Sequence, residues 1–185
     1  MEIACMYVRH NVTEEFIGDM HDVSQPTISR IITSLVPVVK AVLEEFVPDA
    51  REAIEIVKER LCLVDGTITP CWSYDDQPEL WSRKKGTTGF NARLVSLLDG
   101  EPIFISDPLA GKNHDAAAFA ATAVADIVNH SGGGIGDNGY QGRDGMATPR
   151  KTPPGGALSE MDKTCNAELS ALRAPIERVV AHFKN

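Results

Sequence analysis

The chain has 185 residues, a formal net charge of −8, and 43% hydrophobic against 24% charged residues. This length allows one well-packed core with a small accessory domain, and the composition is that of an ordinary globular protein. The charge excludes a uniformly basic DNA-binding surface, because neutralising phosphates requires clustered Lys and Arg. No stretch approaches the roughly 20 apolar residues of a membrane span, and no signal peptide is predicted. We therefore expect a cytoplasmic protein with no membrane partner.

Residues 1–47 are predicted to form short helices separated by turn residues. Ser24 suits a helix N-cap, and Pro26 is tolerated in the first turn, where its missing N–H is not needed. A buried stripe with spacings of three and four is predicted at Ile28, Ile31, Ile32 and Leu35. The polar side chains left on the outer side are those of Gln25, Thr27, Ser29, Arg30 and Thr33. From the residues alone, this pattern fits either a DNA-reading helix-turn-helix or a plain helical hairpin with a solvated face.

Residues 48–60 are predicted to form a connecting helix, because Asp49 and Glu52 have the spacing of a capping box. The apolar run Leu61–Val64 follows and predicts a buried strand that stops at Asp65 and turns at Gly66. A carboxylate directly after a buried strand requires a compensating partner, most simply a cation. Asp65 is therefore a candidate metal ligand.

The middle of the chain predicts a β-hairpin followed by a helix. Residues 90–98 and 101–106 read as strands around Asp99-Gly100, a strong hairpin signal. Residues 116–128 are good helix formers, with Asp115 in the first turn. A glycine-rich segment, predicted to be a poor strand, leads to Asp137, and residues from 158 onward read as helical. Residues 134–139 formally fit a dinucleotide-binding G-x-G-x-x-G pattern, but no helix is predicted to follow, which disfavours that reading.

Several motifs occur in a characteristic order along the chain. They are the string Ser24–Arg30, Val64-Asp65-Gly66-Thr67, a Lys/Gly segment at 84–89, Ser106-Asp107-Pro108 with His114-Asp115, Asp137-Asn138-Gly139-Tyr140, and a helix carrying Glu177. With these motifs the chain resembles the DDE transposases of bacterial insertion sequences, a DDE superendonuclease family related to Harbinger. The resemblance implies an α/β fold: a ribonuclease H-like (retroviral integrase-like) catalytic core at 61–185, preceded by an all-α helix-turn-helix domain at 1–47.

The resemblance also implies that Asp65, Asp137 and Glu177 are the catalytic residues and the metal ligands. They are separated by 137 − 65 = 72 and 177 − 137 = 40 residues. Carboxylates suit Mg²⁺, with Mn²⁺ as a substitute, and two such ions can serve phosphodiester cleavage. Asp65 would bridge both ions, and the other two acids would each hold one. Taken singly, each acid is more often a capping carboxylate or, for Glu177, an ion-pair partner on its helix.

The implied function is metal-dependent DNA cleavage and strand transfer at the terminal inverted repeats of an insertion sequence. Arg83, Lys84, Lys85 and Arg93 form a local basic cluster; Lys84 and Lys85 are expected to bind DNA phosphates, with His114 and Asp115 as secondary candidates. The expected partners are double-stranded DNA, at transposon ends and target, and further copies of the chain in a homodimer or higher oligomer. On DNA the protein would be associated with the nucleoid.

Two alternatives remain open from the sequence. Glu177 lies eight residues before Asn185 (185 − 177), whereas family members continue further. The first alternative is therefore a C-terminally truncated, catalytically inactive DNA-binding remnant. The second is a general metal-dependent nuclease, which the N-terminal reader disfavours.

Overall fold

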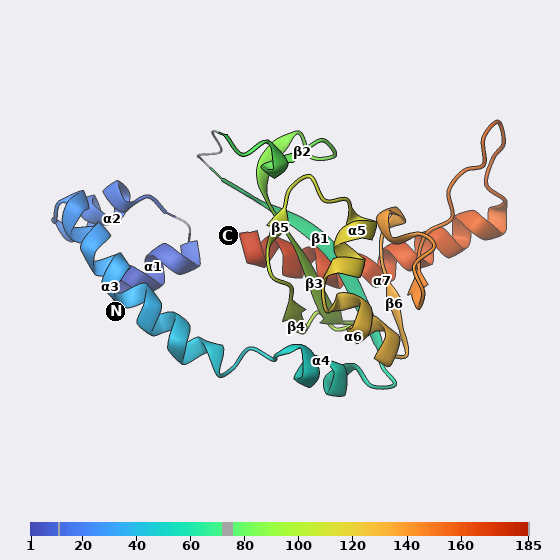
Figure 1. Ribbon diagram of the computed structural model, residues 1–185, viewed down its shortest axis with the longest axis horizontal. Coiled ribbons are helices and arrows are strands. Elements are labelled where there is room, and N and C mark those ends of the chain that lie inside the picture. The colour runs from blue at the N-terminus through green and yellow to red at the C-terminus, as the bar shows by residue number, and fades with distance from the viewer. Residues whose placement is uncertain (11, 72–75, 185) are drawn as a thin grey trace. The chain divides into compact units, whose positions relative to one another are not determined.

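The computed structural model describes residues 1–10, 12–71 and 76–184 (Figure 1). The chain divides into two compact units, Met1–Val47 and Pro48–Lys184. The first unit is helical, and the second is a sheet covered by helices on both faces. Each unit is described by itself.

The first unit consists of α1 (Glu2–His10), α2 (Glu14–His21) and α3 (Gln25–Glu44). Thr13 caps α2, and its Oγ1 accepts the Phe16 N–H at 3.2 Å. The small core is formed by Ile17 of α2 and by Ile28 and Ile32 of α3. These two α3 residues confirm half of the predicted stripe, whereas Ile31 and Leu35 are only half-buried.

Helix α3 has 20 residues, and its buried residues are Ile28 and Ile32. It passes through Pro37 and ends in exposed apolar residues, including Val38, Val42 and Leu43. Its mean hydropathy of 1.4 over 18 residues, 11% of which are buried, meets the length and apolarity of a membrane span. The expectation that no stretch comes close to a span is therefore wrong for this helix. Length and composition alone also describe helices that never enter a membrane.

The second unit begins with α4 (Ala50–Val57), and the predicted capping box is confirmed. The strands are β1 (Leu61–Pro70), β2 (Trp81–Ser82), β3 (Thr87–Leu97), β4 (Pro102–Ile105), β5 (Leu109–Ala110), β6 (Gly133–Ile135) and β7 (Met146–Ala147). The helices are α5 (Asp115–Ala121), α6 (Val124–His130) and α7 (Glu160–Lys184), and short 3-10 turns, η1 and η2, lie at Pro78–Leu80 and Asn138–Tyr140.

The sheet mixes antiparallel and parallel pairs. Its order is β2-β3-β1-β6-β7, and β4 and β5 also pair with β3. Strand β3 is antiparallel to β1, whereas β6 is parallel to both β1 and β7. Antiparallel strands followed by a helical crossover to parallel ones make the ribonuclease H-like core that was predicted.

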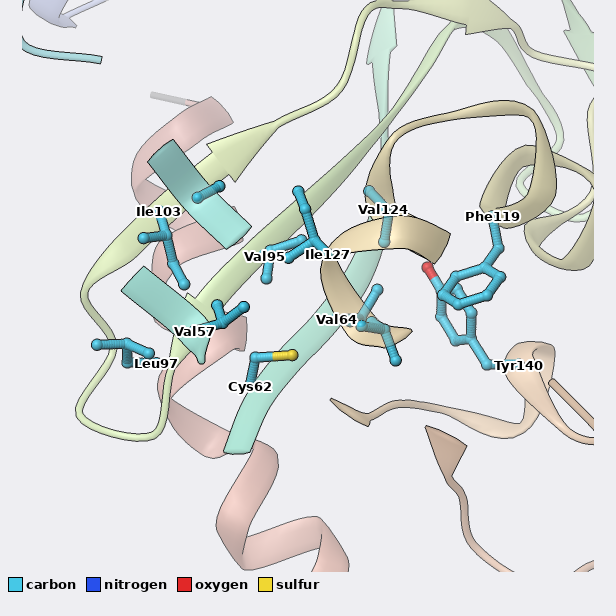
Figure 2. Packing of buried hydrophobic residues seen from close by; sticks show 12 residues of the cluster. Val57, Cys62, Val64, Val95, Leu97, Ile103, Phe119, Val124, Ile127 and Tyr140 are labelled. Atoms are coloured by element: carbon cyan, nitrogen blue, oxygen red, sulfur yellow. The ribbon is translucent and has the colours of Figure 1, made fainter. Parts of the chain in front are cut away.

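Helices cover both faces of the sheet (Figure 1). On the first face, Cys62 and Val64 of β1 pack with α4, α5 and α6 (Figure 2), and the Phe119 ring meets the Tyr140 ring edge-on at 5.7 Å between centroids. On the second face, Leu63 of β1 packs against Ile176 of α7. Because side chains alternate along a strand, Asp65 shares the second face with Leu63.

Two predictions about elements need correction, and a third is confirmed. The chain does not turn at Gly66, because strand β1 runs unbroken from Leu61 to Pro70. The helix expected over 116–128 is broken into α5 and α6 at Thr122, whose backbone is extended (φ −121, ψ 165). The glycine-rich segment before Asp137, predicted to be a poor strand, forms the short strand β6 between β1 and β7. Glycine is required at position 134, because a Cβ there would lie 2.5 Å from Sδ of Met146.

The predicted hairpin is confirmed. Strands β3 and β4 pair around the turn at Asp99 and Gly100, and Gly100 adopts φ +92. This left-handed conformation favours glycine.

Candidate active site

Two of the predicted acids meet because their strands are parallel neighbours. In the β1–β6 register, Leu63 lies opposite Ile135. Asp65 and Asp137 each follow two residues later and therefore reach the same level of the sheet. Asp137 caps η2, and its Oδ1 accepts the Gly139 N–H at 2.8 Å. The fold thus places two carboxylates side by side.

Asp65 is held in a partly buried position at the α7 face. Its Oδ1 accepts the Gly66 N–H at 2.8 Å, and its Oδ2 lies 3.9 Å from Nη2 of Arg173. Burial raises the pKa of Asp65, the Gly66 hydrogen bond and Arg173 oppose this, and the charge of Asp137 raises the pKa further. The net effect is a raised pKa, which is the behaviour of a carboxylate that lacks a full counter-charge.

A third acid, Asp115, lies on the first face and belongs to a buried ion pair. Its Oδ1 lies 3.1 Å from Nη2 of Arg93, whose side chain is completely buried. Lys84 binds the other oxygen of Asp115 and also lies 3.6 Å from Oδ2 of Asp137. Burial would raise the pKa of Asp115, but the Lys84 hydrogen bond and the charges of Arg93 and Lys84 outweigh it and lower that pKa.

The ammonium of Lys84 is stabilised by the same acids. Burial alone would lower the pKa of Lys84, yet Asp115 and Asp137 outweigh burial and raise it. Lys84 therefore links the ion pair on the first face to Asp137.

Two glycines are required for this packing. A Cβ on Gly66 would lie 1.5 Å from Nη1 of Arg93, and a Cβ on Gly139 would lie 2.4 Å from Oδ2 of Asp115. The glycines of the Asp65-Gly66 and Asn138-Gly139 pairs therefore leave room for the charged groups.

Glu177 stands apart from the pair of acids. It is exposed on α7, and the α7 side chain near Asp65 is Arg173, one helical turn earlier. Glu177 follows Arg173 by four residues, which is a rise of about 6 Å along the helix. It therefore lies about one turn beyond the residue that contacts Asp65. In residues 1–184, leaving out 11 and 72–75, no group of three His, Cys, Asp or Glu is arranged to hold a metal. The structure therefore brings together two members of the predicted triad.

The basic cluster expected from the sequence divides into two kinds of residue. Arg93 is completely buried, so its assignment to a DNA-facing cluster is wrong. Arg83, Lys84 and Lys85 are exposed and line a pocket of about 320 Å³ beside Asp115. His114 is also exposed there, at the N-cap of α5, and its side chain makes no capping hydrogen bond.

The predicted DNA-reading residues lie at the start of α3. Arg30 and Thr33 are exposed, whereas Thr27 and Ser29 are half-buried. The Gln25 amide donates to Glu14 of α2 and so fixes the two helices to each other. The guanidinium of Arg30 is held against its own helix, with Nε 3.1 Å from the Pro26 carbonyl oxygen.

Sequence reasoning missed the parts played by Arg93, Arg173 and Trp81. The available signal for Arg93 was a charged residue inside an otherwise apolar strand, which requires a buried counter-ion. Trp81 is 47% exposed and lines the pocket.

Comparison with known families agrees with this arrangement. Residues 64–185 match the DDE superfamily endonuclease, and residues 4–45 match the helix-turn-helix of the DDE superfamily endonuclease. Comparison with curated proteins finds no match. The first match covers both acids of the pair, Arg173 and Glu177, and more than half of the chain. With two neighbouring acids on a ribonuclease H-like sheet and a helical DNA-binding unit before it, the chain belongs to the DDE superfamily endonucleases.

Proposed function

We propose that this protein is a transposase that cleaves DNA and transfers the cut strand at the terminal inverted repeats of an insertion sequence. The observation that carries the proposal is the placement of Asp65 and Asp137 at one level of neighbouring parallel strands. Family membership supports an endonuclease, and the helix-turn-helix supports binding to DNA.

The acids present fit a divalent metal. Mg²⁺ prefers oxygen ligands, and it is bound through one or two carboxylates together with waters and substrate phosphates. Asp65 and Asp137 supply such a pair, and the raised pKa of Asp65 reflects an incomplete counter-charge. Bound Mg²⁺ or Mn²⁺ would activate the attacking oxygen and stabilise the leaving oxygen of a phosphodiester. We assign Glu177 as the third ligand, because α7 crosses the face that carries Asp65.

The remaining residues would position the DNA. The exposed Arg30 and Thr33 would meet the DNA groove, while Lys84 and Lys85 would bind phosphates beside the acids. Arg173 would keep the Asp65 carboxylate oriented until substrate arrives. Because an element has two ends, two or more copies of the chain would act together on the DNA.

Strand nicking of supercoiled plasmid with Mg²⁺ or Mn²⁺ tests the proposal. Asp65→Asn and Asp137→Asn should each reduce nicking at least about a hundredfold, because each removes a charged ligand that phosphodiester chemistry requires. Asp126→Asn, a matched change at an exposed position of α6, should retain the wild-type rate. Nicking by Asp65→Asn at the wild-type rate would rule out this active site.

The separation of Glu177 from the acid pair favours a second candidate, a DNA-binding remnant without catalysis. Glu177→Gln distinguishes the two. Loss of nicking in this variant supports the three-acid enzyme. A wild-type protein that binds DNA but nicks with neither metal supports the remnant.

A further inference from the structure

The pocket next to the acid pair has a charge opposite to that of the whole protein. Among the residues that the structure describes, 72–75 not being among them, the lining includes Arg83, Lys84, Lys85 and Lys112 and one acid, Asp115. The chain as a whole carries −8. Cations concentrated in one hollow of an acidic protein favour an anionic ligand at that place.

Close packing and hydrogen bonds hold the lining of the pocket in place. A Cβ on Gly111 would lie 2.3 Å from the Leu80 carbonyl oxygen, so the loop before α5 packs tightly against η1. The Lys112 N–H donates to the Glu79 carbonyl at 2.9 Å, and the Asn91 amide donates to the Asn113 carbonyl at 2.9 Å. These contacts tie the loop to η1 and to β3 and fix the shape of the hollow before any ligand binds.

The size and the aromatic rim narrow the class of ligand. A volume of about 320 Å³ is at the small end of ligand pockets, which span roughly 300–1,000 Å³. A pocket of this volume can enclose about one nucleotide, whereas an intact duplex could contact only its rim. Trp81, 47% exposed on the pocket wall, offers a surface on which a nucleobase of any identity can stack.

The pocket adjoins the acid pair through shared neighbours, although neither Asp65 nor Asp137 lines it. Lys84 and Asp115 line the pocket and also form the ion-pair chain that reaches Asp137. Gly66, the residue after Asp65, lines it as well. A DNA strand that places a phosphate at Asp65 and Asp137 would therefore deliver a neighbouring nucleotide to the pocket mouth.

We propose that this pocket takes one unpaired nucleotide of the DNA strand processed at Asp65. Its phosphates lie on the cations of the 83–85 turn and on Lys112, and its base stacks on Trp81. This inference rests on the proposed function, because it assumes that DNA is the substrate of the acid pair. It adds a requirement: the end of the duplex must open by at least one nucleotide to occupy the site.

The test is equilibrium DNA binding by the full chain, measured by fluorescence anisotropy in EDTA at fixed salt. The probes are a blunt duplex and the same duplex with a short single-stranded extension at its 3′ or 5′ end. We expect the wild-type protein to prefer one extended duplex by roughly tenfold, the size of one base–aromatic stack. Trp81→Ala should remove this preference without changing blunt-duplex affinity, and Trp81→Phe should largely keep it.

A matched control is Phe90→Ala, which removes a 42% exposed aromatic outside the pocket lining and should leave the preference intact. A deoxynucleoside monophosphate should compete with the extension but not with the blunt duplex. Melting curves show whether each variant is folded. If Trp81→Ala does not fold, the comparison of Trp81→Phe with the wild type still tests the proposal.

Equal wild-type affinity for blunt and extended duplexes would overturn the pocket assignment. An equal loss of affinity for both duplexes in Trp81→Ala would overturn it as well. The measurement needs no metal and no turnover, so it fails independently of the nicking assay. A chain that nicks plasmid without preferring an extension keeps the proposed function and loses only the nucleotide pocket.

Discussion

Lys84 is the cation that contacts two acids of the candidate site, Asp115 and Asp137. Its ammonium binds Asp115 and lies 3.6 Å from Asp137, one of the two carboxylates assigned to metal. A divalent ion held by Asp137 would therefore compete with Lys84 for that carboxylate.

Replacing this lysine should increase the response to metal. In Lys84→Gln, Asp137 loses its paired lysine while Asp115 keeps Arg93, so the protein without added metal should melt at a lower temperature and gain more on addition of Mn²⁺. Apparent Mn²⁺ affinity should rise several-fold, measured by calorimetric titration and by melting curves. Lys163→Gln, which removes the same charge from an exposed pair with Glu160, should leave the Mn²⁺ response unchanged. An identical response in both variants would show that Lys84 does not compete with metal.

The raised pKa of Asp65 predicts how stability depends on pH. A carboxyl that binds its proton more tightly in the folded state makes stability fall as pH rises from its unfolded value, about 3.9, through the raised folded value. At pH 7 without metal the charged Asp65 therefore lowers stability. Asp65→Asn should melt higher than the wild type there, by about 2–4 °C for each kcal/mol gained.

This advantage should shrink as the pH falls through the raised pKa, because the wild-type carboxyl then becomes neutral like asparagine. Melting curves of both proteins in EDTA, taken from pH 7 down to pH 4, check the trend. Asp126→Asn serves as the exposed control. An advantage of Asp65→Asn that stays constant with pH would assign the effect to packing instead of charge.

At the scale of elements, helix α7 packs on the sheet through Ile176, with the partly buried Leu169, Val179 and Val180 around it. Ile176 is completely buried against Leu63, Leu94 and Ile135, while its neighbours Arg173 and Glu177 are more exposed. The position of Arg173 beside Asp65 therefore depends on this anchor.

Ile176→Ala should destabilise the second unit by about 2–5 kcal/mol, the usual cost of removing a buried aliphatic side chain. Urea unfolding followed by tryptophan fluorescence measures it, since both tryptophans of the chain lie in that unit. Leu172→Ala, at a 44% exposed position of the same helix, should cost under about 1 kcal/mol. Equal losses for both would mean that α7 is not anchored through Ile176.

The elements that the sequence predicted well are those with local causes. The capping box of Asp49 and Glu52 and the turn at Asp99-Gly100 depend on residues only a few positions apart, and both formed as expected. Strand β6 was predicted to be a poor strand, yet it forms, and its Gly134 is closely surrounded by Met146 and Val128. Local propensity scores such glycines as unfavourable, whereas tertiary packing requires them.

The candidate site, like the elements, was predictable only where its causes lie close together in the sequence. Asp65 was proposed because a carboxylate follows an apolar strand, and its grouping with Asp137 came from the family resemblance. The parallel pairing of β1 and β6 brings these two residues to one level of the sheet. The buried Arg93 with Asp115, and Arg173 facing Asp65, depend on which face of the sheet each side chain takes. That choice is set by the register between strands distant in sequence, which local patterns do not reveal.

At the scale of the whole molecule, the chain is acidic overall, and this holds for the helix-turn-helix unit as well. In residues 1–47, 3 basic side chains stand against 7 acidic ones. Few phosphate contacts are therefore available to the helix-turn-helix, and its affinity for DNA must depend strongly on single residues. Arg30, exposed at the start of α3, is the cation best placed for this.

Arg30→Ala should weaken binding to duplexes that the wild-type protein selects from a random library, by roughly 5- to 150-fold if the guanidinium contacts a base. The affinity for scrambled duplexes should fall less, because these duplexes lack that contact in the wild-type complex. If Arg30 instead binds a phosphate, both kinds of duplex should lose affinity alike, and the slope of log K against log salt should decrease by about 0.9. Arg9→Ala removes the same charge from the exposed end of α1 and is the matched control. Equal affinities of the two variants for selected DNA would remove Arg30 from the DNA interface and leave α3 as a structural helix.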